Sequence, residues 1–339
     1  MSEPGRRIED YDYPLPEERI AQEGASPRDH SRLMVVERGH GVREHARFFE
    51  LPRFLRAGDL LVFNETKVIP ARLMGEKEGG ARVEALLVRE EAPDRWWAMV
   101  RPGRRLRPGA RVRFGELAAE VVAVDDEGLR LLAFSQPVRP HLERLGRTPL
   151  PPYIHRPVDP ERYQTVYARR EGSVAAPTAG LHFTPRLLAE LAAMGVEQAR
   201  VVLHVGPGTF QPVKGAIEEH RMHAERYEVP PEAAARVNRA LAEGRRVVAV
   251  GTTVVRTLES AFAPGEGVRA GAGETRLFIR PPYRFEVVGG LVTNFHLPRS
   301  TLLMLVAAFA GYEVTMAAYR EALERDYRFF SLGDAMLIV

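Results

Sequence analysis

Two stretches with different secondary-structure patterns most constrain the fold. Between about residues 75 and 148 the chain shows only short β-like segments, such as ARVEALLV and LAAEVVAV, separated by turns such as RPG, DDEG and SQP. From about residue 180 onward, helix-like and strand-like segments alternate. Short strands without helices predict a small antiparallel barrel or sandwich, whereas alternation predicts an α/β layer with a largely parallel sheet.

These patterns predict an α/β protein. A mixed, mostly parallel sheet domain, residues 1–70 and 150–339, is interrupted by a small antiparallel β-barrel domain at 71–149. The first 60 residues mix Pro-rich loop with a possible helix near 50–56 and are expected to pack on the C-terminal part. The helices expected in the second half are 185–194, 231–243, 254–262, 300–310 and 315–326, and the strands are 199–205, 246–250, 275–279 and 285–292.

Composition excludes several kinds of chemistry. The 339 residues include no cysteine, which excludes disulfides, cysteine nucleophiles and cysteine-ligated metal or iron–sulfur sites. The N-terminal segment MSEPGRRIEDYDYPLP lacks the apolar region of a signal peptide. The apolar run at 301–311 is too short to span a bilayer and predicts a buried helix. We therefore expect a cytoplasmic protein without membrane contact.

The cations are unevenly distributed by type. The chain has 45 Arg and only three Lys, one of which is Lys67. Six of the arginines lie in RPGRRLRPGARVR, residues 101–113. Such a run is often a solvated surface, but guanidinium groups also match phosphate geometry. The prediction is nucleic-acid contact, made through Arg101, Arg104, Arg105 and Arg107.

A run of small residues precedes a helix start in EGSVAAPTAGLHFT, residues 171–184. Small side chains let a backbone approach a ligand closely, and helix N-termini favour anions. Thr184 is a good N-cap, and the aromatic Phe183 and the imidazole of His182 stand beside it. A tight surface loop is the alternative. We expect this loop to line a cleft and to face the turns at 206–209 and 251–253.

Two further Gly-containing turns follow apolar strands. In RRVVAVGTTVVRTLESA, Gly251 is followed by Thr252, Thr253 and a helix, which is the layout of an anion or ribose site. It is neither a Walker A nor a GxGxxG motif, and a plain N-cap is the alternative. In ARVVLHVGPGTFQPV, His204 ends a strand, and Gly206, Gly208 and Thr209 form a turn that a ligand could touch through its backbone.

Three polar clusters complete the candidate site. HRMHAERY contains His220, His223 and Glu225, which suit acid–base chemistry or substrate binding. If this segment is helical, the two histidines share a face. A zinc site would need a third ligand from elsewhere, and a solvated surface is the other alternative. The remaining clusters are FNETKVIPARL, with Asn64, Thr66, Lys67 and Arg72, and TNFHLPRST, with Asn294 and His296. For the first of these, a strand cap with a salt bridge is the alternative.

Taken together, these stretches resemble a known enzyme family. DYPLPEERIAQ, GDLLVFNETKVIPARL, YQTVYARREGSVAAPTAGLHFT, LHVGPGTFQPV, VVAVGTTVVRTLES, LVTNFHLPRSTLLMLVAAFAG and YRFFSLGDAMLI are similar to motifs of the S-adenosylmethionine:tRNA ribosyltransferase-isomerases of queuosine biosynthesis. The resemblance runs in order from near residue 10 to 338. Sequence is looser only in the predicted barrel.

The resemblance implies a specific reaction. The family uses S-adenosylmethionine as a ribosyl donor and modifies 7-aminomethyl-7-deazaguanine at the wobble position of tRNA. The product is epoxyqueuosine, and adenine and methionine are released. It also implies an α/β domain with an inserted β-barrel and no metal, cofactor or prosthetic group. We expect a monomer whose partners are tRNA and S-adenosylmethionine.

Such a reaction needs a base for the 5′ proton and an acid for the departing adenine. The motifs contain several histidines, and the sequence does not decide which of them is the base or the acid. The catalytic candidates are His220, His223, Glu225, His182 and Lys67. The methionine carboxylate would suit the helix after Gly251, and Phe183 is a candidate for stacking on a base. The substrate-binding candidates are Asn64, Thr66, Arg72, Thr178, Phe183, His204, Gly206, Gly208, Thr209, Gly251, Thr252, Thr253, Arg256, Asn294 and His296. A non-catalytic RNA-binding protein and a metal-dependent hydrolase are the alternative functions.

Overall fold

The chain divides into two compact units. The computed structural model describes residues 5–206, 213 and 215–339. One unit, here called the sheet unit, comprises Met1–Thr66, Pro152–Arg170 and Ala176–Val339. The other, the barrel unit, comprises Lys67–Pro151 and Glu171–Ala175.

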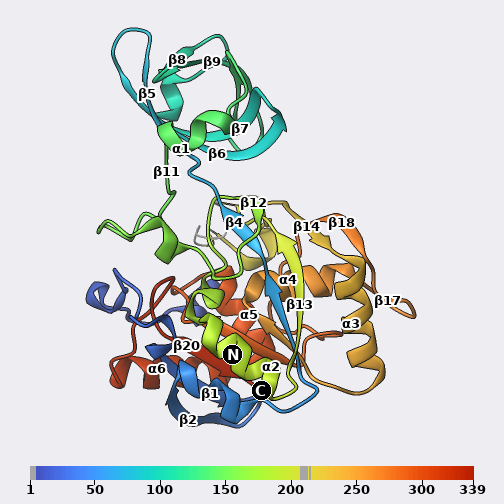
Figure 1. Cartoon of the computed structure of the whole chain (residues 1–339). Coiled ribbons are helices and arrows are strands. Elements are labelled where there is room, and N and C mark those ends of the chain that lie inside the picture. The colour runs from blue at the N-terminus through green and yellow to red at the C-terminus, as the bar shows by residue number, and fades with distance from the viewer. Residues whose placement is uncertain (1–4, 207–212, 214) are drawn as a thin grey trace. The chain divides into compact units, whose positions relative to one another are not determined.

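The sheet unit is built on one nine-stranded mixed sheet (Figure 1). The central pairs β13–β3, β3–β15 and β15–β19 are parallel, as is β20–β1, and the other pairs are antiparallel. In sheet order the strands are β18 (Gly271–Thr275), β14 (Glu225–Val229), β13 (Glu197–Leu203), β3 (Leu60–Asn64), β15 (Val247–Val250), β19 (Gly290–Asn294), β20 (Ala335–Ile338), β1 (Arg32–Glu37) and β2 (Gly41–Arg47).

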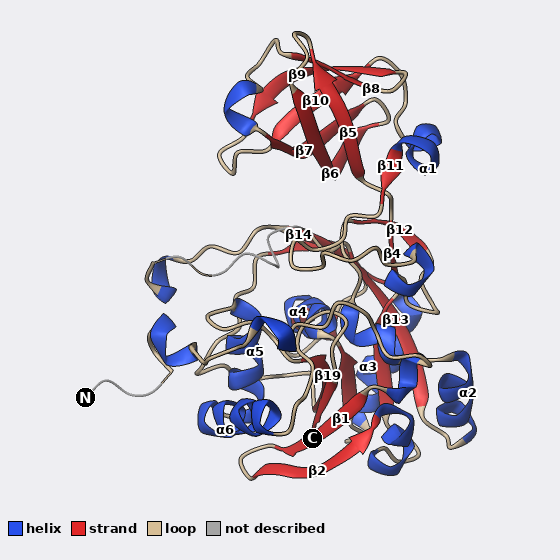
Figure 2. Ribbon diagram, turned by 90° about the vertical axis from the view of Figure 1, so that its left-hand side faces the viewer, coloured by secondary structure: helices blue, strands red, loops and turns tan. Residues whose placement is uncertain are grey.

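Helices cover both faces of this sheet (Figure 2). Along β3, Leu60 and Val62 join the core cluster that also holds residues of α3, α4, α5 and α6, whereas Leu61 and Phe63 join the cluster with α2. A strand that is buried on both faces has a continuous apolar sequence, as the LLVF segment of β3 does. The helices are α2 (Pro185–Ala193), α3 (Pro231–Ala242), α4 (Thr252–Ala261), α5 (Thr301–Ala310) and α6 (Tyr312–Glu324).

Short elements connect the larger ones. The 3-10 helices of the sheet unit are η1 (Ile8–Tyr11), η2 (Glu17–Arg19), η3 (Arg28–His30), η4 (Phe48–Phe54), η7 (Pro160–Tyr163), η8 (Thr178–His182) and η10 (Ile217–Glu219). The remaining short strands are β4 (Thr66–Val68), β12 (Arg170–Ser173), β16 (Phe262–Ala263) and β17 (Gly267–Val268).

Several sequence-based boundaries are wrong. The strand expected at 275–279 is β18, which ends at Thr275, where the Thr275 hydroxyl accepts a hydrogen bond from the Leu277 N–H. The strand expected at 285–292 begins only at Gly290, because the buried carboxylate of Glu259 takes the N–H groups of residues 286–288. Residues 220–224 are not helical, and the possible helix near 50–56 is the 3-10 helix η4.

The barrel unit is a closed antiparallel barrel. Its six long strands pair in the order β5, β6, β7, β10, β9, β8, and β8 pairs back onto β5. Gly75 lies at this closure, where a Cβ would stand 2.4 Å from the Arg113 carbonyl oxygen. The predicted fold class, a mixed α/β sheet with an inserted antiparallel barrel, is confirmed. The elements are β5 (Arg72–Lys77), β6 (Arg82–Ala92), β7 (Arg95–Arg101), η5 (Gly103–Arg105), β8 (Arg111–Phe114), β9 (Leu117–Val124), β10 (Arg130–Phe134), η6 (Arg139–His141), α1 (Leu142–Leu145) and β11 (Gly146–Arg147).

Within the described ranges, no single helix is both long and apolar enough to cross a membrane. The bent pair α5 and α6 passes such a test by length and composition only, and nine of the ten residues of α5 are buried in the sheet unit.

Candidate active site

One pocket of the sheet unit gathers segments that are far apart in sequence. It is lined by the small-residue loop 176–179, the turn 251–253 and the end of β19 at Thr293 and Asn294. Its other walls come from Val205, His296, Leu302, Phe330 and Ser331. Parallel strands β15 and β19 both end here, and this edge of a parallel sheet is where α/β proteins gather ligand sites.

The turn 251–253 presents the start of a helix to the pocket. β15 ends at Val250, Gly251 takes a φ of 95°, and α4 begins at Thr252. The positive φ suits glycine, which lets the chain turn from strand to helix within one residue. The first N–H groups of an α-helix have no partner within the helix, so this turn can bind an anion.

Asn64 fixes the position of Thr253. Its side-chain nitrogen donates to the Leu203 carbonyl oxygen at 2.9 Å and to the Thr253 hydroxyl at 3.3 Å. Its oxygen accepts from the N–H groups of Thr66 at 3.2 Å and Leu203 at 3.0 Å. An amide has two donors and two acceptor positions, so Asn64 is fully hydrogen-bonded and ties the ends of β3 and β13 to α4.

His182 lies behind the pocket wall and fixes Asn294. Its Nδ1 lies 2.7 Å from the Ser31 hydroxyl, its Nε2 lies 3.3 Å from the Asn294 amide nitrogen, and its ring stacks on Phe48. Burial is the main cause that lowers the pKa of His182 to about 3. Both ring nitrogens are engaged, so in this structure His182 offers no nitrogen for proton transfer to a ligand.

His296 lines the pocket itself. Its Nε2 lies 2.8 Å from the Thr293 hydroxyl, and its backbone N–H donates to the Tyr319 hydroxyl at 2.9 Å. Burial lowers the pKa of His296 to about 3, so the imidazole is neutral at neutral pH. The ring and the helix start of α4 thus face the same pocket.

A second wall of the pocket was missed by sequence reasoning. Phe330 and Ser331 line it, and Phe330 has a φ of 73°, which is unusual for a non-glycine residue. Its carbonyl oxygen accepts from the Asn294 amide, and its ring packs on Tyr153 with a centroid distance of 4.1 Å. The motif YRFFSLGDAMLI carried no polar cluster, so only the tertiary structure shows this contribution.

Glu225 and Arg256 form a buried ion pair beside the pocket segments. The Arg256 guanidinium donates to the Glu225 carboxylate and, at 3.1 Å, to the Leu277 carbonyl oxygen. The carboxylate also accepts from the Gly206 N–H at 3.0 Å. Within the described part of the chain, one Arg256 nitrogen, Nη2, is buried without a hydrogen-bond partner. The pair therefore fixes the backbone at Gly206, three residues after the end of β13.

Other predicted residues lie at different places. His204 directly follows β13, and its Nδ1 lies 2.8 Å from the Thr66 hydroxyl. His220 and His223 are half-buried, and His220 packs edge-on against Phe278. Burial is the main cause that lowers the pKa of His220, and the neighbouring His223 adds to it. Gly208 and Thr209 lie outside the described residues.

The stacking role predicted for Phe183 is wrong. Its side chain is fully buried in the sheet-unit core, where it packs edge-on against Phe48 and Phe63. It has no face left for a ligand. The physical reason is that Phe183, directly before α2, packs into the core cluster between α2 and the sheet, whereas residues 176–179 line the pocket.

Lys67 and Arg72 belong to the barrel unit. The Lys67 ammonium forms an ion pair with Glu171 at 3.1 Å. Arg72 donates to the Leu150 carbonyl oxygen at 2.9 Å and lies 3.5 Å from Glu84. The structure thus gives both side chains partners within their own unit.

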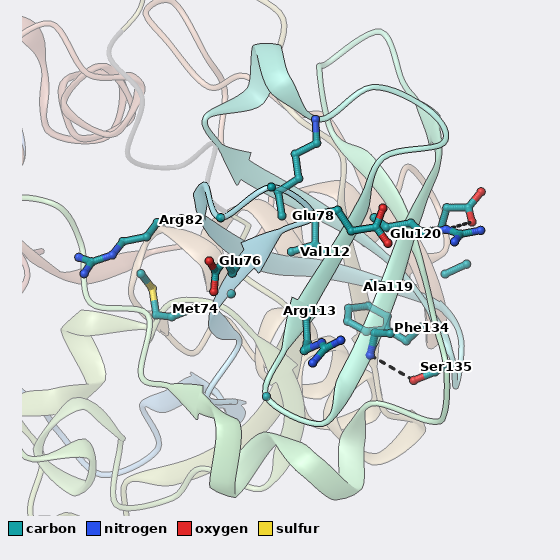
Figure 3. Close-up of a pocket in the computed structure, with 18 of the residues that line it drawn as sticks. Met74, Glu76, Glu78, Arg82, Val112, Arg113, Ala119, Glu120, Phe134 and Ser135 are labelled. Atoms are coloured by element: carbon teal, nitrogen blue, oxygen red, sulfur yellow. Dashed lines mark hydrogen bonds and ion pairs between the residues drawn. The ribbon is translucent and has the colours of Figure 1, made fainter.

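The barrel unit carries a groove of about 1340 Å³ (Figure 3). Glu76, Glu78 and Glu120 line it together with Arg82 and Arg113, so both signs of charge are present. The four arginines predicted to contact nucleic acid lie elsewhere, at the end of β7 and in the loop after it, and all four are exposed. Among the described residues, Arg101, Arg104, Arg105 and Arg107 form no ion pair.

Comparison with known proteins decides the family. The model of a family described as queuosine biosynthesis protein matches residues 8–338. The chain belongs to this family. An S-adenosylmethionine:tRNA ribosyltransferase-isomerase of Thermus thermophilus is 62% identical, over 98% of this chain and 99% of its own length. One of Moorella thermoacetica is 58% identical over 98% of this chain and 100% of its own.

A solved relative supports the same assignment. The crystal structure of an S-adenosylmethionine tRNA ribosyltransferase from Thermotoga maritima matches with a TM-score of 0.57 and 44% identity, covering 97% of this chain and 99% of that one. In this queuosine biosynthesis protein, the described residues include no group of three or more His, Cys, Asp or Glu placed to hold a metal ion. The roles of individual pocket residues stay predictions.

Proposed function

We propose that the protein transfers the ribosyl group of S-adenosylmethionine to 7-aminomethyl-7-deazaguanine at the wobble position of tRNA and isomerises it, giving epoxyqueuosine, adenine and methionine. The observation that carries this proposal is the pocket that joins loop 176–179, the α4 start and the β19 end within a chain that matches the family along its length. The relatives' names supply the reaction class.

The pocket suits the co-substrate on physical grounds. The small residues of loop 176–179 let a ligand approach the backbone, and the start of α4 favours the methionine carboxylate. The sulfonium acidifies the neighbouring 5′ carbon, so a base must be held near it. No cofactor is needed for this chemistry, and S-adenosylmethionine acts as a co-substrate.

Removal of the 5′ proton requires a base that is unprotonated beforehand, which for a histidine is the neutral imidazole. His296 is neutral and lines the pocket, but a pKa of about 3 makes it a weak base. His220 is less buried, and its lowered pKa also favours the neutral form. We therefore keep His220 or His223 as the proposed base and assign His182 to positioning.

The barrel unit supplies the surface for tRNA in this proposal. It carries sixteen Lys and Arg against thirteen Asp and Glu, whereas the whole chain has a formal charge of +3. The excess positive charge therefore resides on this unit. The side chains of Arg104, Arg105 and Arg107 are exposed and form no ion pair with other described residues, so they can pair with phosphates.

The test is reconstitution of the reaction. The purified protein is incubated with S-adenosylmethionine and tRNA bearing 7-aminomethyl-7-deazaguanine, and nucleosides are analysed by mass spectrometry. We expect epoxyqueuosine with equal amounts of adenine and methionine, also after treatment with a chelator. The control is the same tRNA with guanine at the wobble position. Binding of tRNA without adenine release would favour the non-catalytic RNA-binding alternative.

A further inference from the structure

Asn294 lines the pocket, and its side-chain oxygen is an acceptor without a partner among the described residues. Its amide nitrogen donates to the Phe330 carbonyl oxygen at 3.1 Å. A carbonyl oxygen can only accept, so the nitrogen must face Phe330 and the side-chain oxygen must face the other way. That oxygen, Oδ1, is buried, and among the described residues it has no hydrogen-bond partner.

Two residues behind Asn294 hold this orientation. His182 Nε2 takes the second amide hydrogen of Asn294, which requires an unprotonated Nε2. A neutral imidazole with an unprotonated Nε2 carries its proton on Nδ1, which is 2.7 Å from the Ser31 hydroxyl. Burial of His182 keeps the ring neutral. The chain from Ser31 through His182 thus fixes the orientation of the Asn294 amide, with Oδ1, which can only accept, turned away from His182 and Phe330.

The acceptor and the helix start of α4 share one pocket. A buried oxygen that can only accept calls for an N–H or O–H donor on the ligand, whereas a helix N-terminus calls for an anion. The strands that carry these two features, β15 and β19, are hydrogen-bonded neighbours, with the Gly251 N–H bonded to the Val292 carbonyl oxygen at 2.8 Å. Their proximity fits an anion and a donor on the same carbon atom.

We propose that this pocket holds the amino-acid end of S-adenosylmethionine, with the carboxylate at the first N–H groups of α4 and the ammonium on Asn294 Oδ1. Ser31 and His182 are positioning residues for that contact. This inference rests on the proposed function and makes Asn294 a residue that determines specificity for the amino-acid group.

Three small molecules test the contact directly. Methionine, 4-(methylthio)butanoate, which lacks the ammonium, and 3-(methylthio)propylamine, which lacks the carboxylate, are titrated into the purified wild-type protein by calorimetry or ligand-observed NMR. A charge-assisted hydrogen bond to a buried acceptor predicts that methionine binds about ten- to a hundredfold more tightly than the butanoate. Equal binding of these two would overturn the proposal without any variant.

Variants then locate the preference. Asn294→Ala should bring the ratio of methionine to butanoate affinity close to one and leave butanoate affinity unchanged. His182→Phe keeps an aromatic ring against Phe48 but cannot accept from Asn294, and it should lower the ratio in part. Asn238→Ala is the matched control, because among the described residues the Asn238 side chain forms hydrogen bonds only with the backbone of Val268.

The outcomes separate this inference from the proposed function. If folded Asn294→Ala still prefers methionine over 4-(methylthio)butanoate as strongly as the wild type does, the assignment of Asn294 is overturned. This holds whatever the activity with tRNA. Methionine preference that depends on Asn294, together with no adenine release from S-adenosylmethionine and tRNA, supports the amino-acid site and rejects the proposed reaction.

Discussion

At the residue scale, histidines of similar sequence context have different surroundings. His182 and His296 are each only 5% exposed, and their rings are neutral at neutral pH. His220 and His223, in contrast, are half-buried in an irregular segment. Burial lowers a histidine pKa because it penalises the charged form. The buried pair therefore suits hydrogen bonding and positioning, and the half-buried pair suits proton exchange.

The first prediction concerns His220 and His223. General acid–base groups contribute roughly a hundred- to ten-thousandfold in rate. We expect one of His220→Ala and His223→Ala to lower kcat on that scale while affinity for S-adenosylmethionine is largely kept. Exchange of deuterium from the 5′ position into solvent, if that step is reversible, measures proton removal itself. Wild-type turnover by both variants would direct the search to His204, His296 or Lys67.

The second prediction concerns stability against pH. For His182 and His296 the native pKa of about 3 lies below the unfolded value of 6.5, so the unfolded state binds more protons between these values. Stability is therefore complete above about pH 6.5 and falls as pH falls. Between pH 6.5 and 5 each buried histidine should cost roughly 1.5 kcal/mol of unfolding free energy.

Urea unfolding across this range measures the effect. In His182→Gln the loss of stability between pH 6.5 and 5 should be smaller than in the wild type by roughly 1.5 kcal/mol, although the variant is less stable at every pH. The range lies above the pKa of ordinary carboxyl groups, and any contribution of Glu259, whose pKa is raised by burial, is common to both proteins and cancels in the comparison. An unchanged slope would mean that His182 is not held neutral by the fold.

At the element scale, the start of α4 depends on one glycine. Gly251 has a φ of 95°, and a Cβ there would meet Ala179 and Thr253 at 3.6 Å, which is ordinary contact. Gly244, after α3, has a φ of 64° and open space around it. Alanine at either position is strained by the backbone but does not clash, so the two glycines form a matched pair.

The third prediction uses this pair. Gly251→Ala and Gly244→Ala should each lower the free energy of unfolding by about 1–3 kcal/mol, because both glycines have a positive φ and Gly251, with a ψ of 152°, lies in a region that is essentially restricted to glycine. Only Gly251→Ala should also raise the KM for S-adenosylmethionine, since Gly251 lines the pocket. Thermal unfolding and steady-state kinetics measure the two effects. A similar KM change in both variants would show that strain alone, and not the pocket, is responsible.

At the scale of the whole molecule, the two units divide the work proposed here. The sheet unit contains the pocket, and the barrel unit carries the excess positive charge and the exposed arginine loop. Phosphate contacts contribute to RNA affinity in proportion to the counterions they release. Loss of arginines from the barrel should therefore change binding of tRNA and leave the chemical step intact.

The fourth prediction is the triple variant Arg104→Ala, Arg105→Ala and Arg107→Ala. Its apparent KM for tRNA should rise, and the log–log dependence of that KM on salt should flatten by about one unit for each lost phosphate contact. Arg144→Ala is the control, because Arg144 already forms an ion pair with Glu116. A collapse of kcat at saturating tRNA would contradict a binding role for the loop.

The sequence by itself determined most helices of the sheet unit and two of the segments that line the pocket. Alternation after residue 180 predicted α2 to α6, because apolar periodicity and start signals such as Thr184 are local. The Gly-containing turn at 251–253 and the loop at 171–184 were also recognisable, since backbone freedom and small side chains are written in the residue types. The run of arginines at 101–113 was likewise visible in the sequence, and the structure shows that Arg101, Arg104, Arg105 and Arg107 are exposed.

Only the tertiary structure decided which side chains face the pocket. His182 and Asn294 are 112 residues apart, and their hydrogen bond reverses the role expected of His182. Phe183 follows His182 directly yet lies in the core, and Phe330 lines the pocket without any polar signal in its motif. Long-range packing sets these positions, because the direction of a side chain depends on which distant strand or loop buries it. A local sequence pattern does not identify that distant partner.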